Sequence, residues 1–252
     1  MCLVLLAVGV RPDLPLVVAA NRDEFHARPS AAAHRWPGAA GIVAGRDLEA
    51  GGTWLGVAAG GRFAAVTNVS ELPASGAFRS RGDLVPGFLA GGEGARGYAD
   101  RIDGSAYRGF NLLLWDGEEL VYRSNRHPGQ VLGPGVHALA NGVLDEARFK
   151  VSRSRAALEA TLASSPGGPL SEALFAPLAD RSLPPEPEQR SVAGMSEAEV
   201  TALAAPFIVG ERYGTRASTV VLVTRETVAL EERRFAPGGV PAGVSSLSWD
   251  RM

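Results

Sequence analysis

The chain has 252 residues, of which 46% are hydrophobic and 21% charged, and its formal net charge is −2. This hydrophobic fraction is sufficient for a sizeable core, and the length fits one domain spanning residues 1–252. The near-neutral charge, without a Lys/Arg run, excludes the basic surface that is typical of nucleic-acid-binding proteins. A single cysteine, Cys2, excludes an intramolecular disulfide and a cysteine-cluster metal site, and it favours a reducing, cytoplasmic location.

The amino-terminal segment is apolar but short. Residues 3–8 are all hydrophobic, and the turn residues Arg11, Pro12 and Asp13 end the run soon afterwards. A run of this length, without a preceding basic segment, predicts neither a signal peptide nor a membrane span. It predicts a strand instead.

In chain order, the strands are predicted mostly as hairpins. Residues 2–8 and 16–20 carry apolar residues on both faces, as in a sheet covered on both sides, and the turn at 11–13 joins them. Residues 26–40 are predicted to be a loop. Further strands are expected at 42–46, 53–58, 62–69, 111–115, 119–123, 136–140, 218–224 and 227–235. The turn Asp116-Gly117 is the strongest short hairpin signal among them.

Helices are predicted at residues 80–89, 94–102, 145–162, 171–178 and 196–204, the last of which begins with a capping box. The elements therefore follow the order hairpins, helices, hairpins, helices, hairpin. This order differs from the strand–helix alternation of a parallel doubly wound sheet. Antiparallel sheets with apolar residues on both faces need cover on both sides, so we predict an α+β fold, a four-layer α-β-β-α sandwich of two antiparallel sheets.

The position of Cys2 directly after Met1 suggests a chemistry. Removal of Met1 would leave a thiol and a free α-amine on one carbon. The thiol has an ordinary pKa of about 8.5 and the amine one of roughly 7.7–8.0, so the amine can accept the thiol proton near neutral pH. A nucleophile of this kind requires no cofactor. The alternative interpretation is an incidental cysteine.

Three charged residues follow the second predicted strand, in the segment Asn21-Arg22-Asp23-Glu24. The first hairpin would bring this segment beside Cys2. Because neighbouring residues of a strand point to opposite faces, Asn21 and Asp23 share one face, and Arg22 and Glu24 share the other. Only one pair can therefore face Cys2 unless the chain twists. An arginine there would lower the pKa of the thiol, and an aspartate would hold or orient the amine.

Several short motifs occur in an order that resembles a known family. They are Met1-Cys2, Asn21-Arg22-Asp23-Glu24, Arg28-Pro29, Gly52-Thr53-Trp54-Leu55-Gly56, Thr67-Asn68, Ser80-Arg81-Gly82, Gly109-Phe110-Asn111-Leu112, Asn141 and Tyr213-Gly214-Thr215-Arg216. On these motifs the chain is identified as a member of the NRDE-motif family, also called the transport and Golgi organisation protein 2 family. That family resembles cysteine N-terminal-nucleophile hydrolases of the choloylglycine hydrolase and penicillin acylase type.

The resemblance implies the same sandwich fold and a set of site residues. The candidate catalytic residues are Cys2, Arg22, Asp23, Asn68, Asn141 and Arg216. Cys2 would be the nucleophile, with Arg22 and Asp23 beside it. Asn68 and Asn141 would be donors to the oxyanion, and Arg216 would be a further cation. Taken alone, the two asparagines are ordinary turn residues and Arg216 is an ordinary surface arginine.

The chain also departs from these patterns. In the choloylglycine type the arginine and the aspartate are separated along the strand, whereas Arg22 and Asp23 are adjacent here. Members of the NRDE family often have serine where this chain has Ala140 and Ala217. The loss of two hydroxyls near the predicted site weighs slightly against a hydrolase.

Two functions follow from the sequence. One is an amide hydrolase that acts on a small or acyl-chain amide. The other is a non-catalytic binding and trafficking protein for haem or for a lipid such as acyl-CoA, in which Arg22 and Arg216 pair with carboxylates or phosphates. His26 and His34 are then candidate haem ligands, although both are more typical of surface loops. An inactive scaffold that acts through partners is a third alternative.

Overall fold

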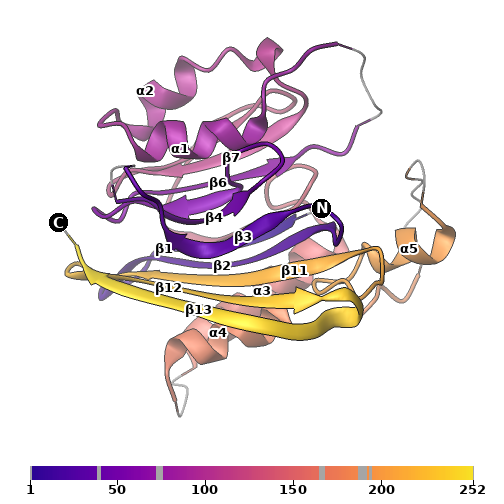
Figure 1. Ribbon diagram of the computed structural model, residues 1–252. Helices are drawn as coiled ribbons and strands as arrows, with labels where there is room; N and C mark the ends of the chain where they lie inside the picture. The colour runs from indigo at the N-terminus through magenta and orange to yellow at the C-terminus, as the bar shows by residue number, and fades with distance from the viewer. Residues whose placement is uncertain are drawn as a thin grey trace.

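The computed structural model describes residues 2–38, 41–71, 76–164, 168–186, 192 and 195–251. Two antiparallel sheets are stacked face to face between two layers of helices (Figure 1). Helices α1 (Leu84–Leu89) and α2 (Ala95–Asp100) lie over one sheet, and α3 (Phe149–Ala163) and α4 (Leu170–Leu178) lie under the other. This arrangement confirms the predicted α+β sandwich.

The six-stranded sheet has the order β10-β1-β2-β11-β12-β13, so the two ends of the chain share one sheet (Figure 1). Its strands are β10 (Gly135–Leu139), β1 (Cys2–Arg11), β2 (Leu14–Phe25), β11 (Tyr213–Val223), β12 (Thr227–Ala236) and β13 (Val240–Asp250). Helices α3 and α4 cover its outer face along β10, β1, β2 and β11.

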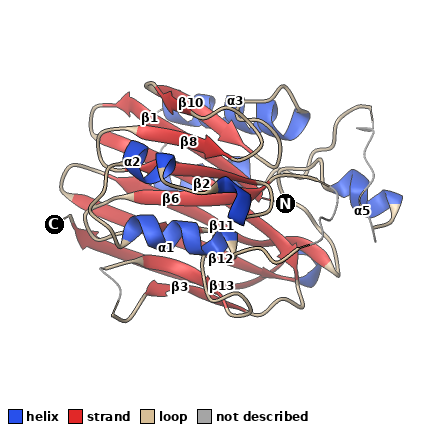
Figure 2. Cartoon of the chain, turned by 90° about the horizontal axis from the view of Figure 1, so that it is seen from above, coloured by secondary structure: helices blue, strands red, loops and turns tan. Residues whose placement is uncertain are grey.

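The seven-stranded sheet has the order β3-β4-β5-β6-β7-β8-β9. Its strands are β3 (Ser30–Arg35), β4 (Val43–Asp47), β5 (Leu55–Val57), β6 (Phe63–Asn68), β7 (Phe110–Trp115), β8 (Leu120–Ser124) and β9 (Gln130–Leu132). Seen from above, α1 and α2 lie across this sheet, and α5 (Glu197–Ala202) stands apart at the side (Figure 2).

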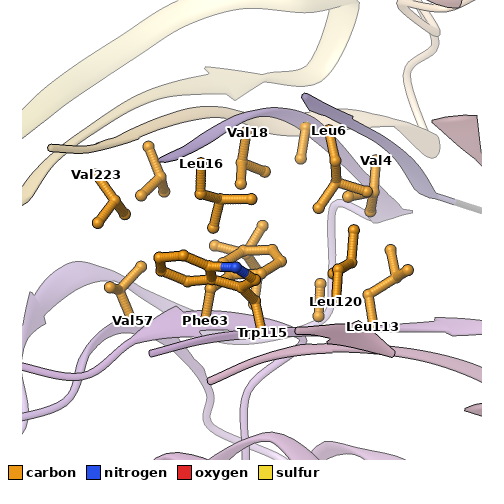
Figure 3. Packing of buried hydrophobic residues seen from close by; sticks show 14 of the residues in the cluster. Val4, Leu6, Leu16, Val18, Val57, Phe63, Leu113, Trp115, Leu120 and Val223 are labelled. Atoms are coloured by element: carbon orange, nitrogen blue, oxygen red, sulfur yellow. The ribbon is translucent and has the colours of Figure 1, made fainter. Parts of the chain in front are cut away.

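Alternation along the strands explains the layers. Every second residue of β1 and β2, such as Val4 and Val18, faces the other sheet and meets aromatic side chains that include Phe63 and Trp115 (Figure 3). The residues between them, such as Leu5, pack against α3 and α4 instead. Burying an aliphatic side chain in this way contributes about 1.5–3 kcal/mol. The apolar faces on both sides of these strands therefore require the two-sided cover that the fold provides.

The structure corrects several element boundaries. Residues 30–35, expected in a loop, form β3, because this strand pairs with β4 and Ala33 packs into the core between the sheets. The helix expected from residue 145 begins at Phe149, because Asp145 has a φ of 55°, which is incompatible with a right-handed helix. Strand β11 begins at Tyr213 rather than at 218, and β13 was not expected at all.

None of the described helices is long and apolar enough to cross a membrane.

The turn between β10 and α3 is held by a charged pair. Asp145 Oδ1 accepts a 2.7 Å hydrogen bond from the backbone N–H of Ala138, and its Oδ2 lies 2.9 Å from Nδ1 of His137. This bond to Asp145 raises the pKa of His137. Burial works against ionisation of Asp145, but the bonds from His137 and Ala138 hold the pKa of this carboxyl below its usual value.

The pair predicts a pH-dependent contribution to stability. Because the folded-state pKa of His137 is raised, its contribution is fully present below the unfolded pKa of about 6.5 and is lost as the pH rises through the folded value. His137→Gln should therefore lower the free energy of unfolding by about 1 kcal/mol more at about pH 5.5 than at about pH 8.5. Urea denaturation at both values measures this, and an equal loss at the two pH values would contradict it.

Candidate functional site

A cavity of about 1170 Å³ lies beside the start of β1, and residues of both sheets form its wall. Five of the six predicted site residues line it: Cys2, Arg22, Asp23, Asn68 and Arg216. The sixth, Asn141, follows β10 and reaches Cys2 through a hydrogen bond to its backbone. The fold thus brings together residues that are up to 214 positions apart in the sequence.

The hairpin of β1 and β2 positions the nucleophile candidate. Cys2 is directly opposite Arg22 in the pairing, and Leu3 is opposite Asn21. Cys2 and Val4 lie on the same face of β1, so Cys2 faces the space between the sheets, as does Arg22.

The adjacent residues Arg22 and Asp23 separate as the alternation requires. Asp23 borders the cavity, but its carboxylate points to the helical layer on the other face of the sheet, where Oδ2 accepts a 2.9 Å bond from Lys150 Nζ. Its Oδ1 accepts a 2.7 Å bond from Thr215 Oγ1. Arg22 therefore flanks the Cys2 thiol on the cavity side, whereas the Asp23 carboxylate stands behind it.

Asn21 is also on the rear face, where it connects three segments. Its Nδ2 donates to the carbonyl oxygens of Leu178 and Pro206 at 2.8 and 2.9 Å, and its Oδ1 accepts from Ser218 Oγ at 2.6 Å. The side chain is fully buried. Asn21 thereby ties β2 to the end of α4 and to β11, which fixes the strand end that carries Arg22 and Asp23.

Asn141 holds the backbone of Cys2. Its Oδ1 accepts a 3.1 Å hydrogen bond from the Cys2 nitrogen, and its Nδ2 donates a 2.7 Å bond to the carbonyl of Asn68. The amide of Asn141 is thus engaged in positioning, and its role as an oxyanion donor stays a prediction. Asn68 is exposed in the cavity wall, where its side chain can face a ligand.

The electrostatic surroundings of the thiol act in opposite directions. Burial raises the pKa of Cys2, and the negative charge of Asp23 adds to this effect. The positive charge of the amino terminus, a hydrogen bond from the backbone N–H of Asp23 and the positive charge of Arg22 lower the pKa of the same thiol. The reactivity of Cys2 therefore depends on the balance between these groups.

A β-bulge places Arg216 in the cavity. In the pairing of β11 with β2, Thr215 lies opposite Asp23 and Ala217 lies opposite Arg22, so Arg216 is the extra residue between them. The extra residue reverses the alternation: Thr215 bonds to Asp23 on the rear face, while Ala217 lines the cavity. Arg216 lines the cavity as well, and its guanidinium donates to the carbonyls of Phe25 and Arg28.

The described part of the cavity wall contains eight arginines and five acidic residues. Asp47 forms ion pairs with two of these arginines, at 3.5 Å from Arg22 and 2.6 Å from Arg28, so its single negative charge is shared between them. Arg81 donates to the carbonyl of Gly109 at 3.0 Å, and among the described residues no carboxylate lies within ion-pair distance of Arg81 or Arg216. Burial lowers the pKa of both. These two cations are available to an anionic ligand.

Three residues of this region have no predicted site role from the sequence, although Arg81 belongs to the motif Ser80-Arg81-Gly82. Lys150 and Arg81 are described above, and Glu232 of β12 is buried in the cavity wall, where it accepts a 2.8 Å bond from the backbone of Ala33 in the other sheet. Burial raises the pKa of Glu232. One signal was present: Lys150 is the only lysine of the chain. No group of three or more His, Cys, Asp or Glu residues suited to a metal ion occurs in the described ranges.

Comparison with known proteins identifies the family. The family model described as Transport and Golgi organisation 2 matches residues 1–237. The human Transport and Golgi organization protein 2 homolog is 31% identical over 245 residues, which cover 88% of each chain. The bovine homolog is 35% identical over 161 residues, or 58% of each chain, and the Drosophila melanogaster protein is 29% identical over 127 residues, or 45%. The chain therefore belongs to the Transport and Golgi organisation 2 family.

The bonding of Asn21 predicts a structural role. Asn21→Ala leaves two carbonyls and the Ser218 hydroxyl without their partner, so it should lower the free energy of unfolding by about 2–4 kcal/mol. Asn68→Ala, at an exposed position, is the matched control and should change it by less than about 0.5 kcal/mol. Urea denaturation of both variants tests this, and equal effects would show that the buried bonds of Asn21 contribute little.

Proposed function

We propose that this member of the family is an amide hydrolase in which Cys2, exposed by removal of Met1, is the nucleophile. One observation carries the proposal. The Cys2 nitrogen is held at 3.1 Å by Asn141 Oδ1, and Cys2 itself lines a large cavity. That nitrogen would become the α-amine after Met1 is removed, so the amine would already be oriented by an acceptor. A thiol and an amine on one residue suffice for nucleophile and base.

The reaction would run through an acyl-enzyme. The α-amine takes the thiol proton, and Sγ of Cys2 forms a bond to the amide carbonyl carbon. The side chain of Asn68, exposed in the cavity wall, would donate to the oxygen on which negative charge develops. Arg22, opposite Cys2 in the strand pairing, would favour the thiolate.

The remaining steps restore the enzyme. The tetrahedral intermediate collapses, the C–N bond breaks, and the protonated α-amine gives its proton to the leaving amine. Water then attacks the thioester, the α-amine takes a proton from it, and the carboxylic acid product leaves as the Cys2 thiol is regenerated. No oxidant, metal or cofactor enters this balance.

The charge of the cavity points to the class of substrate. Arg81 and Arg216 bond only to carbonyl oxygens among the described residues, and the described wall has more arginines than acids. An amide that also carries a carboxylate or phosphate would pair with these guanidinium groups. A volume of about 1170 Å³ leaves room for an acyl chain beside such a group.

Two measurements test the hydrolase. The intact mass of protein expressed without an amino-terminal tag should be lower by one methionine. Cys2→Ala should then reduce turnover of an acyl-amide library by at least about a thousandfold, because the bond-forming atom is lost, while the melting temperature stays near that of the parent. Arg96→Ala, an exposed change on α2, is the control and should leave turnover intact. Retention of Met1, or turnover by Cys2→Ala equal to the parent, would contradict the mechanism.

A second candidate is a binding and trafficking protein for haem or acyl-CoA. The same surplus of arginines favours it, because both ligands carry carboxylates or phosphates. His26 also lines the cavity, and burial together with the charge of Arg216 lowers the pKa of its imidazole. A neutral imidazole is the form that binds haem iron. His34 bonds to the carbonyl of Ala32 in β3.

Ligand titration separates the two candidates. If the protein is a carrier, Arg22→Ala and Arg216→Ala should each weaken the binding of haem or of a long-chain acyl-CoA by about tenfold, since each removes a charge-assisted contact. Cys2→Ala and the control Arg96→Ala should bind as the parent does. Absorbance and calorimetric titrations measure the affinities. Unchanged affinity in both cavity variants would exclude this function.

A further inference from the structure

The rear face of the site contains a buried ion pair. The side chains of Asp23 and Lys150 are 0% and 8% exposed, and their charged atoms lie 2.9 Å apart. Thr215 Oγ1 donates to the second carboxylate oxygen at 2.7 Å, and Tyr213 donates to the backbone carbonyl of Asp23 at 3.0 Å. The pair joins the first turn of α3 to the end of β2, across a gap of 127 residues in the sequence.

A buried pair of this kind is costly to maintain. Removing two charges from water can cost more than their mutual attraction returns, so such a pair is weak evidence for a purely stabilising role. Lys150 is moreover the only lysine in a chain that otherwise uses arginine as its cation.

The Asp23–Lys150 ion pair lies next to the strand position opposite Cys2. Arg22 is opposite Cys2 in the strand pairing, and Asp23 follows it. The backbone N–H of Asp23 donates toward the thiol, whereas its carboxylate, on the other face of the sheet, disfavours the thiolate. A group that fixes the carboxylate and cancels its charge would keep the first effect and weaken the second.

We propose that Lys150 is a positioning residue for the Cys2 thiol: its ammonium anchors the Asp23 carboxylate behind the sheet, keeps the Asp23 N–H directed at Sγ, and offsets the negative charge that Asp23 would otherwise present to Cys2. The inference rests on the proposed hydrolase only because that function gives the thiol a reaction to catalyse. The structural evidence for it is the 2.9 Å ion pair and the pairing of β2 with the strand that carries Cys2.

The other groups around the thiol leave this role to Lys150. On the cavity side, Arg22 from β2 and Arg81 from the short 3₁₀ helix Arg81–Asp83 interact with Cys2 as cations. The positive charge of the amino terminus also acts on Cys2, and it is present in every variant. Asn141, which follows β10, is neutral and bonds to the backbone. On the rear face, β11 contributes the Thr215 hydroxyl to the Asp23 carboxylate and the Tyr213 hydroxyl to the Asp23 backbone carbonyl. The ammonium that pairs with this carboxylate at 2.9 Å comes from α3.

Alkylation kinetics test the proposal directly, because Cys2 is the single cysteine of the chain. The assay requires no substrate. The rate of reaction of Cys2 with iodoacetamide is measured across pH for the parent and the variants. Lys150→Met should slow alkylation at neutral pH by roughly fivefold to tenfold and move the profile to higher pH. Asp23→Asn should move it to lower pH, and the double variant Asp23→Asn/Lys150→Met should return close to the parent.

Controls distinguish electrostatic positioning from general loosening. Lys150→Arg keeps the charge and should stay near the parent profile, and Arg155→Met removes an exposed cation of the same helix and should have no effect. A merely structural pair would make the thiol more accessible in both single variants. Shifts of Lys150→Met and Asp23→Asn in the same direction, or no shift in either, would therefore overturn the proposal.

The design also covers variants that fold poorly. If Lys150→Met does not fold, Asp23→Asn is compared with the double variant, which buries no charge; the single variant must alkylate at lower pH, and identical profiles would overturn the proposal. Failure of the proposed function is a separate outcome. If the alkylation profiles of Lys150→Met and Asp23→Asn shift in opposite directions but no amide is turned over, the hydrolase is rejected. Lys150 then still controls the reactivity of the Cys2 thiol.

Discussion

The pairing register of the first hairpin is the constraint on which the site depends. With Cys2 opposite Arg22, the two side chains share one face, and a shift of one residue would put Cys2 on the same face as Asp23 instead of Arg22. Such a shift would also turn the core residues of the shifted strand to the wrong face, because the core between the sheets and the core under α3 and α4 use alternate positions of the same strands. Packing on two sides therefore fixes the chemistry at the strand ends.

The same sheet separates the charges of the site into two environments. On the cavity side, Arg22 is accompanied by Arg81 and Arg216, which bind carbonyls and face an open volume. On the rear side, the Asp23 carboxylate is enclosed and paired with Lys150. Residues 21–24 thus alternate between the cavity and the helical layer. Because they are consecutive in one strand, bonds on the helical side also fix the position of Arg22 on the cavity side.

Local pattern was sufficient to predict the layers, the first hairpin and the separation of Arg22 from Asp23, because strand alternation and turn chemistry are local properties. It did not predict β3, whose alanines have weak strand preference and which is held by pairing with β4 and by Glu232 from the other sheet. Strand β13 was missed because, as an exposed edge strand, it shows little apolar alternation.

The rest of the site depends on contacts between distant segments. The resemblance to the family pointed to Arg216, but the bulge that turns it into the cavity is visible only in the pairing of β11 with β2. Lys150 belongs to a helix that meets β2 through tertiary packing, so no spacing in the sequence connects it with Asp23. The contacts of Asn141 are likewise tertiary, since its amide accepts from the Cys2 nitrogen and donates to the Asn68 carbonyl, whereas its predicted role as an oxyanion donor stays a prediction.

Catalysis and ligand carriage would draw on the same cations, so the geometry of the arginines does not separate them. The difference lies at a single nitrogen. Asn141 Oδ1 can accept a hydrogen from an amide N–H of Cys2 or from an α-ammonium at the same place, and the scaffold suits both states. Only the second supplies a base beside the thiol. The fold therefore prepares the position of Cys2, and the covalent state of its nitrogen decides which chemistry the cavity can perform.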